Sequence, residues 1–329
     1  MSFRSMLAAL SVLSALAGTA SALELQLPAD CTLGKDCFLQ QFPDMKKGEG
    51  ALDPYCGIAT YDDHDGVDLR ILSMKDIERG VPVVAVADGV VLRGRDGVED
   101  RLIVTDAERK AIEPQACGNG IVMSHADGVE TQYCHLRKGS IVVRRGQKLK
   151  AGDKIGEIGA SGLVQFPHVH LSVRLGGKEV DPVTGNEVGS ACIANPADAK
   201  PLFASSVISA IKPDQPTLLG FGLAGSVVEY DKLVIDGVPD TAKPGDQARV
   251  AWAWLANMRP GDRLKIALQG PDGKPIAETT TDPLDRSKAV YFSYTGKKGG
   301  PEPGLYKLDV AVIRNGAPLL HESRDITVE

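Results

Sequence analysis

Two histidines separated by one residue, His168 and His170, are the residues in this sequence best placed to do chemistry. The chain of 329 residues has only six histidines, and five of them lie between positions 64 and 170. The pair belongs to an alternating stretch, Pro167–Arg174, that predicts a β-strand. Residues i and i+2 of a strand point to the same face, roughly 6–7 Å apart. Both imidazoles could therefore serve one small site, although the same pattern also fits two polar side chains on a solvated strand.

A second candidate group lies upstream, in Tyr61–Arg70, where His64 and Asp68 are four positions apart. In a straight strand that separation is about 13 Å, too far for two ligands of one metal ion. Gly66 permits a bend that would bring the two side chains together. With one histidine of the later pair they would give zinc three ligands and leave its fourth position for water, as in catalytic zinc sites. Three nearby acidic residues are alternatives for the carboxylate ligand, or surface charge: Asp62, Asp63 and Asp65.

The third candidate segment runs from His125 to Leu136 and contains Asp127-Gly128. This dipeptide between two alternating stretches predicts a tight β-hairpin. His135 ends one arm of that hairpin, where it is either a structural residue or an imidazole presented beside the metal ion. The H-E-x-x-H helix that is typical of one class of zinc proteases is absent from the sequence, which excludes that class.

The charge balance argues against a nucleic-acid partner. The formal net charge is −6, whereas nucleic-acid-binding domains usually carry a basic patch. The longest basic cluster, Arg137–Arg145, is interpreted as a solvated strand edge.

The N-terminus is typical of a secretory signal peptide. Arg4 precedes an apolar run, Met6–Gly18, and Ala20-Ser21-Ala22 fits a cleavage site after Ala22. No later segment approaches the roughly 20 apolar residues of a membrane helix. We therefore expect an exported protein, periplasmic or secreted.

Six cysteines follow the predicted cleavage site, and an even number in an exported chain predicts three disulfides. Six cysteines permit many pairings, so the connectivity stays open. Position along the chain favours three pairs: Cys31–Cys37, Cys56–Cys192 and Cys117–Cys134. No C-x2-C motif is present, which disfavours a zinc–thiolate site.

The pattern along the chain predicts an all-β protein with two folded parts. Five segments follow: a signal peptide at 1–22, a disulfide-stapled arm at 23–57, a glycine-punctuated β-rich part at 58–194, a proline-rich linker at 195–216 and a second β-rich part at 217–329. The linker contains a predicted short helix at 202–211, and a charged surface excursion is expected at 93–115. About seven short strands after residue 217 predict an immunoglobulin-like β-sandwich. Trp252 and Trp254 within it fit core packing, with sugar binding as the alternative.

Taken together, the three candidate segments resemble a known family. The motifs H-x3-D, H-x2-G-x2-T-x-Y-x-H-L and P-H-x-H follow one another in this order. They resemble the M23 family of zinc metallopeptidases, the lysostaphin- and LytM-like peptidoglycan endopeptidases, over residues 58–182. The resemblance implies a small antiparallel β-fold, similar to a lipoyl-type hammerhead or barrel, for residues 58–194. The charged excursion at 93–115 and the many cysteines depart from the family pattern.

The resemblance also implies roles for particular residues. It identifies His64, Asp68 and His170 as ligands of one zinc ion per chain. His135 and His168 correspond to catalytic histidines that do not bind the metal, and His125 corresponds to a structural position.

The function that the resemblance implies is hydrolysis of peptide bonds in the stem or cross-link peptides of peptidoglycan. The main alternative is a non-hydrolytic relative that binds cell wall or activates an amidase. Such relatives usually lose zinc ligands, and this chain keeps all three. A lipoyl-like carrier and a protease acting on proteins are further alternatives. No nucleic acid and no transmembrane segment are expected, and no feature specifies an oligomeric state.

Overall fold

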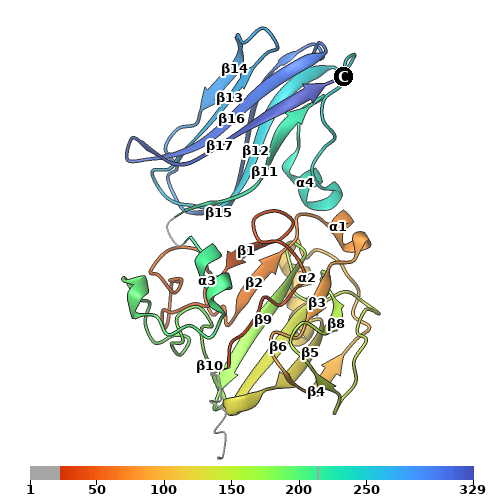
Figure 1. Cartoon of the computed structure of the whole chain (residues 1–329), viewed down its shortest axis with the longest axis vertical. Coiled ribbons are helices and arrows are strands. Elements are labelled where there is room, and N and C mark those ends of the chain that lie inside the picture. The colour runs from red at the N-terminus through yellow and green to blue at the C-terminus, as the bar shows by residue number, and fades with distance from the viewer. Residues whose placement is uncertain (1–22, 213–214) are drawn as a thin grey trace, which may run out of the picture.

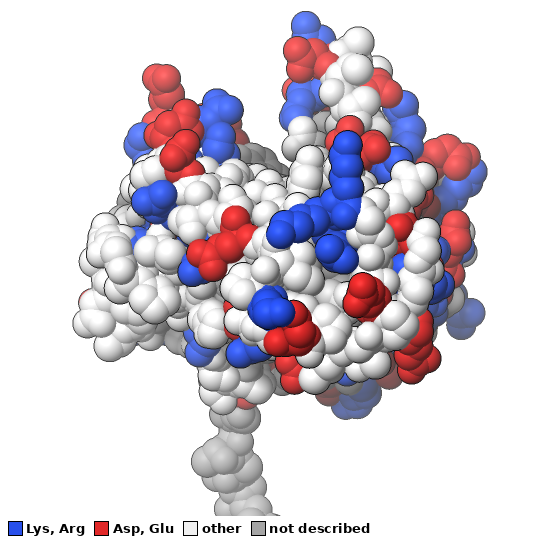
Figure 2. Space-filling model, turned by 90° about the horizontal axis from the view of Figure 1, so that it is seen from above, with Lys and Arg blue, Asp and Glu red and all other residues white. Residues whose placement is uncertain are grey.

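The computed structural model describes residues 23–212 and 215–329. The predicted signal peptide lies outside these residues. Figure 1 shows two β-rich parts arranged along the long axis of the molecule, and the paired strands of both parts are antiparallel. The predicted all-β class is thus confirmed as a mostly β fold, since four short helices are also present. Among the described residues, no helix is long and apolar enough to span a membrane. On the face that Figure 2 shows, basic and acidic side chains form small groups among uncharged ones.

The N-terminal part is built on one large sheet whose strands are hydrogen-bonded in the order β1-β2-β9-β6-β5-β4-β7, with β10 paired to β9. These strands are β1 (Phe38–Gln41), β2 (Val67–Arg70), β4 (Gly89–Arg95), β5 (Asn119–Ser124), β6 (Val129–Leu136), β7 (Lys148–Leu149), β9 (His168–Leu175) and β10 (Lys178–Glu179). A separate pair consists of β3 (Pro82–Val84) and β8 (Lys154–Glu157). The path of the large sheet is open, with β1 and β7 at its ends, so the expected alternative of a closed barrel does not describe it.

Alternation along β9 separates the core from the opposite face of the sheet. Val169 and Leu171 are fully buried in a hydrophobic core that includes Val83 of β3. Because side chains alternate along a strand, His168 and His170 lie on the other face. The predicted strand at 167–174 is thereby confirmed.

The disulfide-stapled arm is part of the large sheet. Its strand β1 pairs with β2, a pairing that the local sequence did not indicate. All three favoured disulfides are formed: Cys31–Cys37, Cys56–Cys192 and Cys117–Cys134.

Short helices connect the strands. They are α1 (Met74–Arg79), α2 (Asp106–Ile112), α3 (Ser205–Ala210) and α4 (Tyr230–Asp236), with short 3₁₀ turns at Glu113–Gln115, Ala126–Gly128 and Pro196–Asp198. Helix α2 lies in the charged excursion, begins with a capping box formed by Thr105 and Glu108, and buries none of its residues. Helix α3 falls within the helix predicted at 202–211, whereas α1 and α4 were not predicted.

The C-terminal part contains two antiparallel sheets, β11-β12-β15 and β14-β13-β16-β17. Their strands are β11 (Thr217–Ala224), β12 (Ala248–Met258), β13 (Arg263–Gln269), β14 (Pro275–Thr280), β15 (Lys288–Lys298), β16 (Gly304–Arg314) and β17 (Ala317–Val328). Leu255 of β12 and Ile266 of β13 belong to one shared core. Trp252 and Trp254 are buried, so they are packing residues and the sugar-binding alternative is wrong.

A buried arginine joins the two parts. The guanidinium carbon of Arg70 lies 4.7 Å from the ring centroid of Phe166 and 4.8 Å from that of Trp254. Arg70 also donates hydrogen bonds to Gln40 Oε1 and to backbone carbonyls. Burial lowers the pKa of Arg70 to about 10. Stacking and hydrogen bonds thus compensate for the removal of this cation from water, and Figure 1 shows α1 and α4 near each other at the same junction.

Candidate metal centre

Three side chains from two separate parts of the sequence meet on the face of the large sheet opposite the core. His64 Nε2 lies 3.2 Å from Asp68 Oδ1 and 3.1 Å from His170 Nδ1, and the latter two atoms are 2.9 Å apart. All three side chains are buried, and their atoms are close enough together to hold one metal ion. Two imidazole nitrogens and one carboxylate oxygen suit zinc and leave a coordination position open. The predicted convergence is confirmed.

The positions of the three residues follow from the strands. Asp68 on β2 and His170 on β9 are direct register partners, and His64 lies in the loop before β2. Gly66 in that loop has a role beyond the predicted bend. A Cβ atom on Gly66 would lie 2.6 Å from both His170 Nε2 and Leu171 O, so only glycine leaves room for the ring of His170.

Neighbouring groups fix which nitrogen of each ring faces the metal position. His64 Nδ1 lies 2.7 Å from the carbonyl oxygen of Phe42. Because a carbonyl can only accept, Nδ1 carries the proton and Nε2 keeps its lone pair. His170 Nε2 lies 2.9 Å from Asp65 Oδ1 and 3.0 Å from Ser172 Oγ, which holds a proton on Nε2 and makes Nδ1 the nitrogen that faces the metal position. Outer contacts of this kind orient the histidine ligands of metal sites.

The structure also distinguishes the three acidic residues that were alternatives for the carboxylate ligand. Asp62 and Asp63 are exposed and do not belong to the cluster. Asp65 contacts the outward-facing nitrogen of His170 and so supports a ligand. The alternation of β9 already placed Ser172 on the face of His170, but the contribution of Phe42 could not be read from the local sequence.

The electrostatics of the cluster favour a cation. Burial acts to lower the pKa of His170, but hydrogen bonds with Asp65 and Asp68 outweigh it and raise that pKa to about 10. Burial acts to raise the pKa of Asp68, but the neighbouring histidines outweigh it and hold the pKa well below its usual range. The buried carboxylate of Asp68 is thus balanced by positive charge on His170, and a divalent ion that displaces this proton would supply the charge instead.

Two more histidines lie beside the cluster. The ring centroids of His135 and His168 are 4.6 Å apart, and that of His135 is 6.0 Å from that of His170. His135 Nδ1 donates to Ser161 O and His168 Nδ1 donates to Phe166 O, each at 2.8 Å. Burial lowers the pKa of both rings. Both are therefore neutral imidazoles whose Nε2 can accept a proton.

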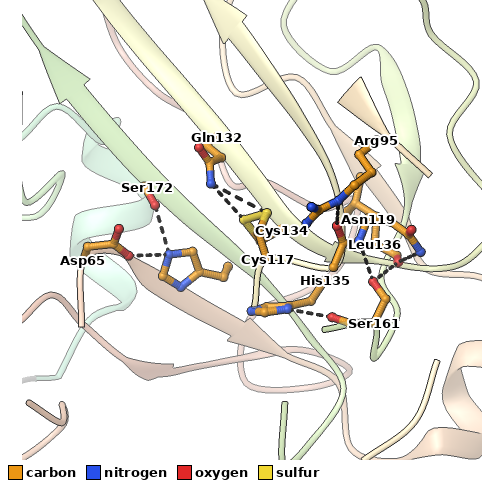
Figure 3. Close-up of a disulfide and its surroundings, with 12 residues drawn as sticks. Asp65, Arg95, Cys117, Asn119, Gln132, Cys134, His135, Leu136, Ser161 and Ser172 are labelled. Atoms are coloured by element: carbon orange, nitrogen blue, oxygen red, sulfur yellow. Dashed lines mark hydrogen bonds and ion pairs between the residues drawn. A yellow bond between two sulfur atoms is a disulfide. The ribbon is translucent and has the colours of Figure 1, made fainter. Parts of the chain in front are cut away.

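The backbone of His135 is unusual and is held by the Cys117–Cys134 disulfide. Its φ is +64°, in the left-handed region that non-glycine residues rarely adopt. The N–H of His135 donates to Cys117 O at 2.8 Å, and the bridged Cys134 directly precedes it. Figure 3 shows the disulfide next to His135, and it shows the hydrogen bond from His135 to the carbonyl oxygen of Ser161. The proximity of this disulfide to the candidate metal centre could not be predicted from the sequence.

His125 lies outside the cluster. Its Nδ1 lies 2.9 Å from Asp88 O and its Nε2 lies 2.7 Å from Thr131 Oγ1. Both nitrogens are thus used in joining neighbouring segments, in line with the structural role expected for this residue.

Comparisons with known proteins show which family this part of the chain is similar to. A profile of peptidase family M23 matches residues 62–182. A zinc-containing peptidase from Vibrio cholerae is 25% identical with a TM-score of 0.28, over 44% of this chain and 38% of that one. A mutant catalytic domain of the prophage-encoded M23 protein EnpA from Enterococcus faecalis is 26% identical with a TM-score of 0.28, over 44% and 88% of the two chains. The catalytic domain of lysostaphin from Staphylococcus simulans is 21% identical with a TM-score of 0.29, over 43% and 86%.

The match thus spans well under half of the Vibrio cholerae peptidase. The profile match contains all three candidate ligands and both neighbouring histidines. On this basis residues 62–182 of the chain match peptidase family M23.

Proposed function

We propose that this protein is a zinc-dependent endopeptidase that cleaves peptide bonds in the stem or cross-link peptides of peptidoglycan. His64, Asp68 and His170 are the ligands of one zinc ion. The observation that carries the proposal is that three buried donor atoms lie 2.9–3.2 Å from one another while two oriented imidazoles lie beside them. Structural zinc sites use four protein ligands, so three ligands with two further bases favour catalysis.

The protein residues move the proton in this reaction. A zinc ion in the site would polarise the scissile carbonyl and lower the pKa of the attacking water. His135 and His168 each have Nδ1 bonded to a backbone carbonyl, so Nε2 is the reactive nitrogen of both. One Nε2 accepts the proton of the water and passes it to the leaving amine. The other ring is also neutral at rest; once its Nε2 has taken up a proton from solvent, that N–H donates a hydrogen bond to the developing oxyanion.

Export and the second β-rich part complete the proposal. Three disulfides are typical of an oxidising compartment outside the cytoplasm, where peptidoglycan lies. We further propose that residues 217–329 form an immunoglobulin-like domain after a linker at 195–216. Its three-stranded and four-stranded sheets around one core support this assignment. Because β1 pairs with β2, the arm at 23–57 belongs structurally with the peptidase domain.

Digestion of purified peptidoglycan tests this function. The zinc-loaded protein should release soluble fragments whose mass spectra show new peptide amino and carboxyl ends and intact glycan chains. His135→Ala should release none. Binding to peptidoglycan without release of fragments would support the non-hydrolytic alternative and contradict our proposal.

A further inference from the structure

The sheet face that carries the candidate metal centre continues past it across β6, β5 and β4. Cys134 of β6 is the register partner of His170 on β9. The register between β5 and β6 shifts at Gly120 of β5, which lies next to Cys134. Gly120 is the register partner of Arg95 on β4. One row of outward-facing positions therefore leads from a candidate zinc ligand to Arg95.

A second row runs beside the first. Ser172, which contacts His170, pairs with Gln132, Gln132 pairs with Val122, and Val122 pairs with Arg93. Neighbouring strands are about 4.8 Å apart, so three steps place β4 roughly 14 Å from β9. In Figure 3, Asp65 and Ser172 lie on the left and Arg95 lies on the right, with Gln132 and the disulfide between them.

The surface along these two rows contains a cavity at β4. A cavity of about 280 Å³ is lined by residues that include Arg93, Arg95 and Gln132. A second hollow of about 350 Å³ on the other side of β4, where the core residues Val91 and Ile121 line it, shares Arg93 and Arg95 and adds Arg144 and Arg145. Arg144 and Arg145 belong to the basic cluster Arg137–Arg145, whose sequence predicts a solvated strand edge.

The arginines at these hollows are only partly neutralised. Arg95 Nε donates to Gly118 O at 2.7 Å, and Arg95 has no ion pair within the described part of the chain. Arg93 lies 3.8 Å from Glu130, a carboxylate that Arg174 also contacts at 3.4 Å. The acidic residue lining the second hollow is Asp96, whose carboxylate accepts backbone hydrogen bonds from Gly97 and Gly139. Positive charge therefore exceeds negative charge at this end of the face.

Building on the proposed peptidase function, we propose that Arg93 and Arg95, flanked by Arg144 and Arg145, form a subsite for a carboxylate of the substrate peptide. Guanidinium groups bind carboxylates through paired charge-assisted hydrogen bonds. An extended peptide advances about 3.3–3.6 Å per residue. The roughly 14 Å between β9 and β4 thus places the recognised carboxylate about four residues from the scissile bond.

The test compares two substrates that differ in charge. Cross-linked muropeptides with free carboxylates, and the same muropeptides after chemical amidation, are digested by the zinc-loaded full chain. The wild type should cleave the free form about tenfold more efficiently, mainly through a lower KM. In Arg93→Gln with Arg95→Gln, cleavage of the free form should fall about tenfold and the preference should disappear. Arg286→Gln, an exposed arginine of the C-terminal part, should keep the wild-type preference.

Salt provides a second readout that does not depend on a variant. Raising NaCl to 0.5 M should reduce the wild-type preference, because partly exposed charges are screened. A wild type without preference, or a double variant that keeps it, would overturn the subsite. Failure of the wild type to cleave either form would instead contradict the proposed peptidase function itself, and the subsite with it.

Discussion

Asp68 and His170 are directly opposite each other on β2 and β9, with Asp68 Oδ1 2.9 Å from His170 Nδ1. Two of the three candidate ligands are therefore placed by the register of the sheet. A slip of one residue in this pairing would turn His170 toward the core. Sites built on paired strands hold their geometry better than sites on loops, and here only His64 comes from a loop.

Removing the carboxylate behind His170 should weaken metal binding. Asp65 Oδ1 lies 2.9 Å from His170 Nε2 and so holds the ring with Nδ1 turned toward the metal position. We expect Asp65→Ala to lower zinc affinity about tenfold or more, as measured by competition with a chromogenic chelator. Asp62→Ala, at an exposed position outside the cluster, is the matched control. Equal zinc affinity in wild type and Asp65→Ala would show that Asp65 does not support the ligand.

Removing the disulfide next to His135 should impair catalysis and spare the metal. Cys117 accepts the hydrogen bond from the N–H of His135, whose left-handed backbone needs support. A displacement of about 1 Å in a catalytic group can cost roughly 100-fold in rate. In the double variant Cys117→Ser, Cys134→Ser we expect kcat to fall by about 10–100-fold with zinc content unchanged.

The control for that experiment is the double variant Cys31→Ser, Cys37→Ser, which removes a different disulfide, one within the N-terminal arm. Its kcat should stay near that of the wild type, and melting curves should show that both variants are folded. If both double variants lose kcat equally, the effect is one of general stability and the positioning role of Cys117–Cys134 is wrong.

A buried carboxyl away from the metal centre should make stability depend on pH. Burial raises the pKa of Asp181 to about 6, despite hydrogen bonds from Val183 and Thr184. Because the folded pKa exceeds the unfolded value, the stabilising contribution is complete below about pH 4 and is lost as the pH rises through about 6. The free energy of unfolding of wild type minus that of Asp181→Asn should therefore fall by on the order of 2 kcal/mol between pH 4 and pH 7.

Urea unfolding of both proteins at the two pH values measures that difference. Taking the difference cancels the titration of all other groups that the substitution does not disturb. A difference that is constant between pH 4 and pH 7 would show that Asp181 titrates alike in the folded and unfolded chain.

Much of the site could be predicted because its signals are local. The hairpin of β5 and β6 follows from Asp127-Gly128, whose φ values of 56° and 73° are both left-handed, as a tight hairpin turn requires. Alternation placed His168 and His170 on one face. The motif order then identified the other candidate ligands through the family resemblance.

The remaining features depend on contacts between distant segments, which local periodicity does not encode. The pairing of β1 with β2, the carbonyl of Phe42 behind His64 and the stacking of Arg70 on Trp254 belong to this group. The same holds for Arg144 and Arg145: their basic cluster is visible in the sequence, but they meet Arg93 and Arg95 only in the folded chain.

The most direct test of the account separates metal binding from catalysis. Zinc per chain, measured by elemental analysis after gel filtration, is compared with cleavage of purified peptidoglycan for wild type, His170→Ala and His135→Ala. We expect about one zinc per chain in the wild type and in His135→Ala, and close to none in His170→Ala, with cleavage by the wild type alone. Stoichiometric zinc in His170→Ala, or wild-type cleavage by His135→Ala, would contradict the assignment of ligands and bases.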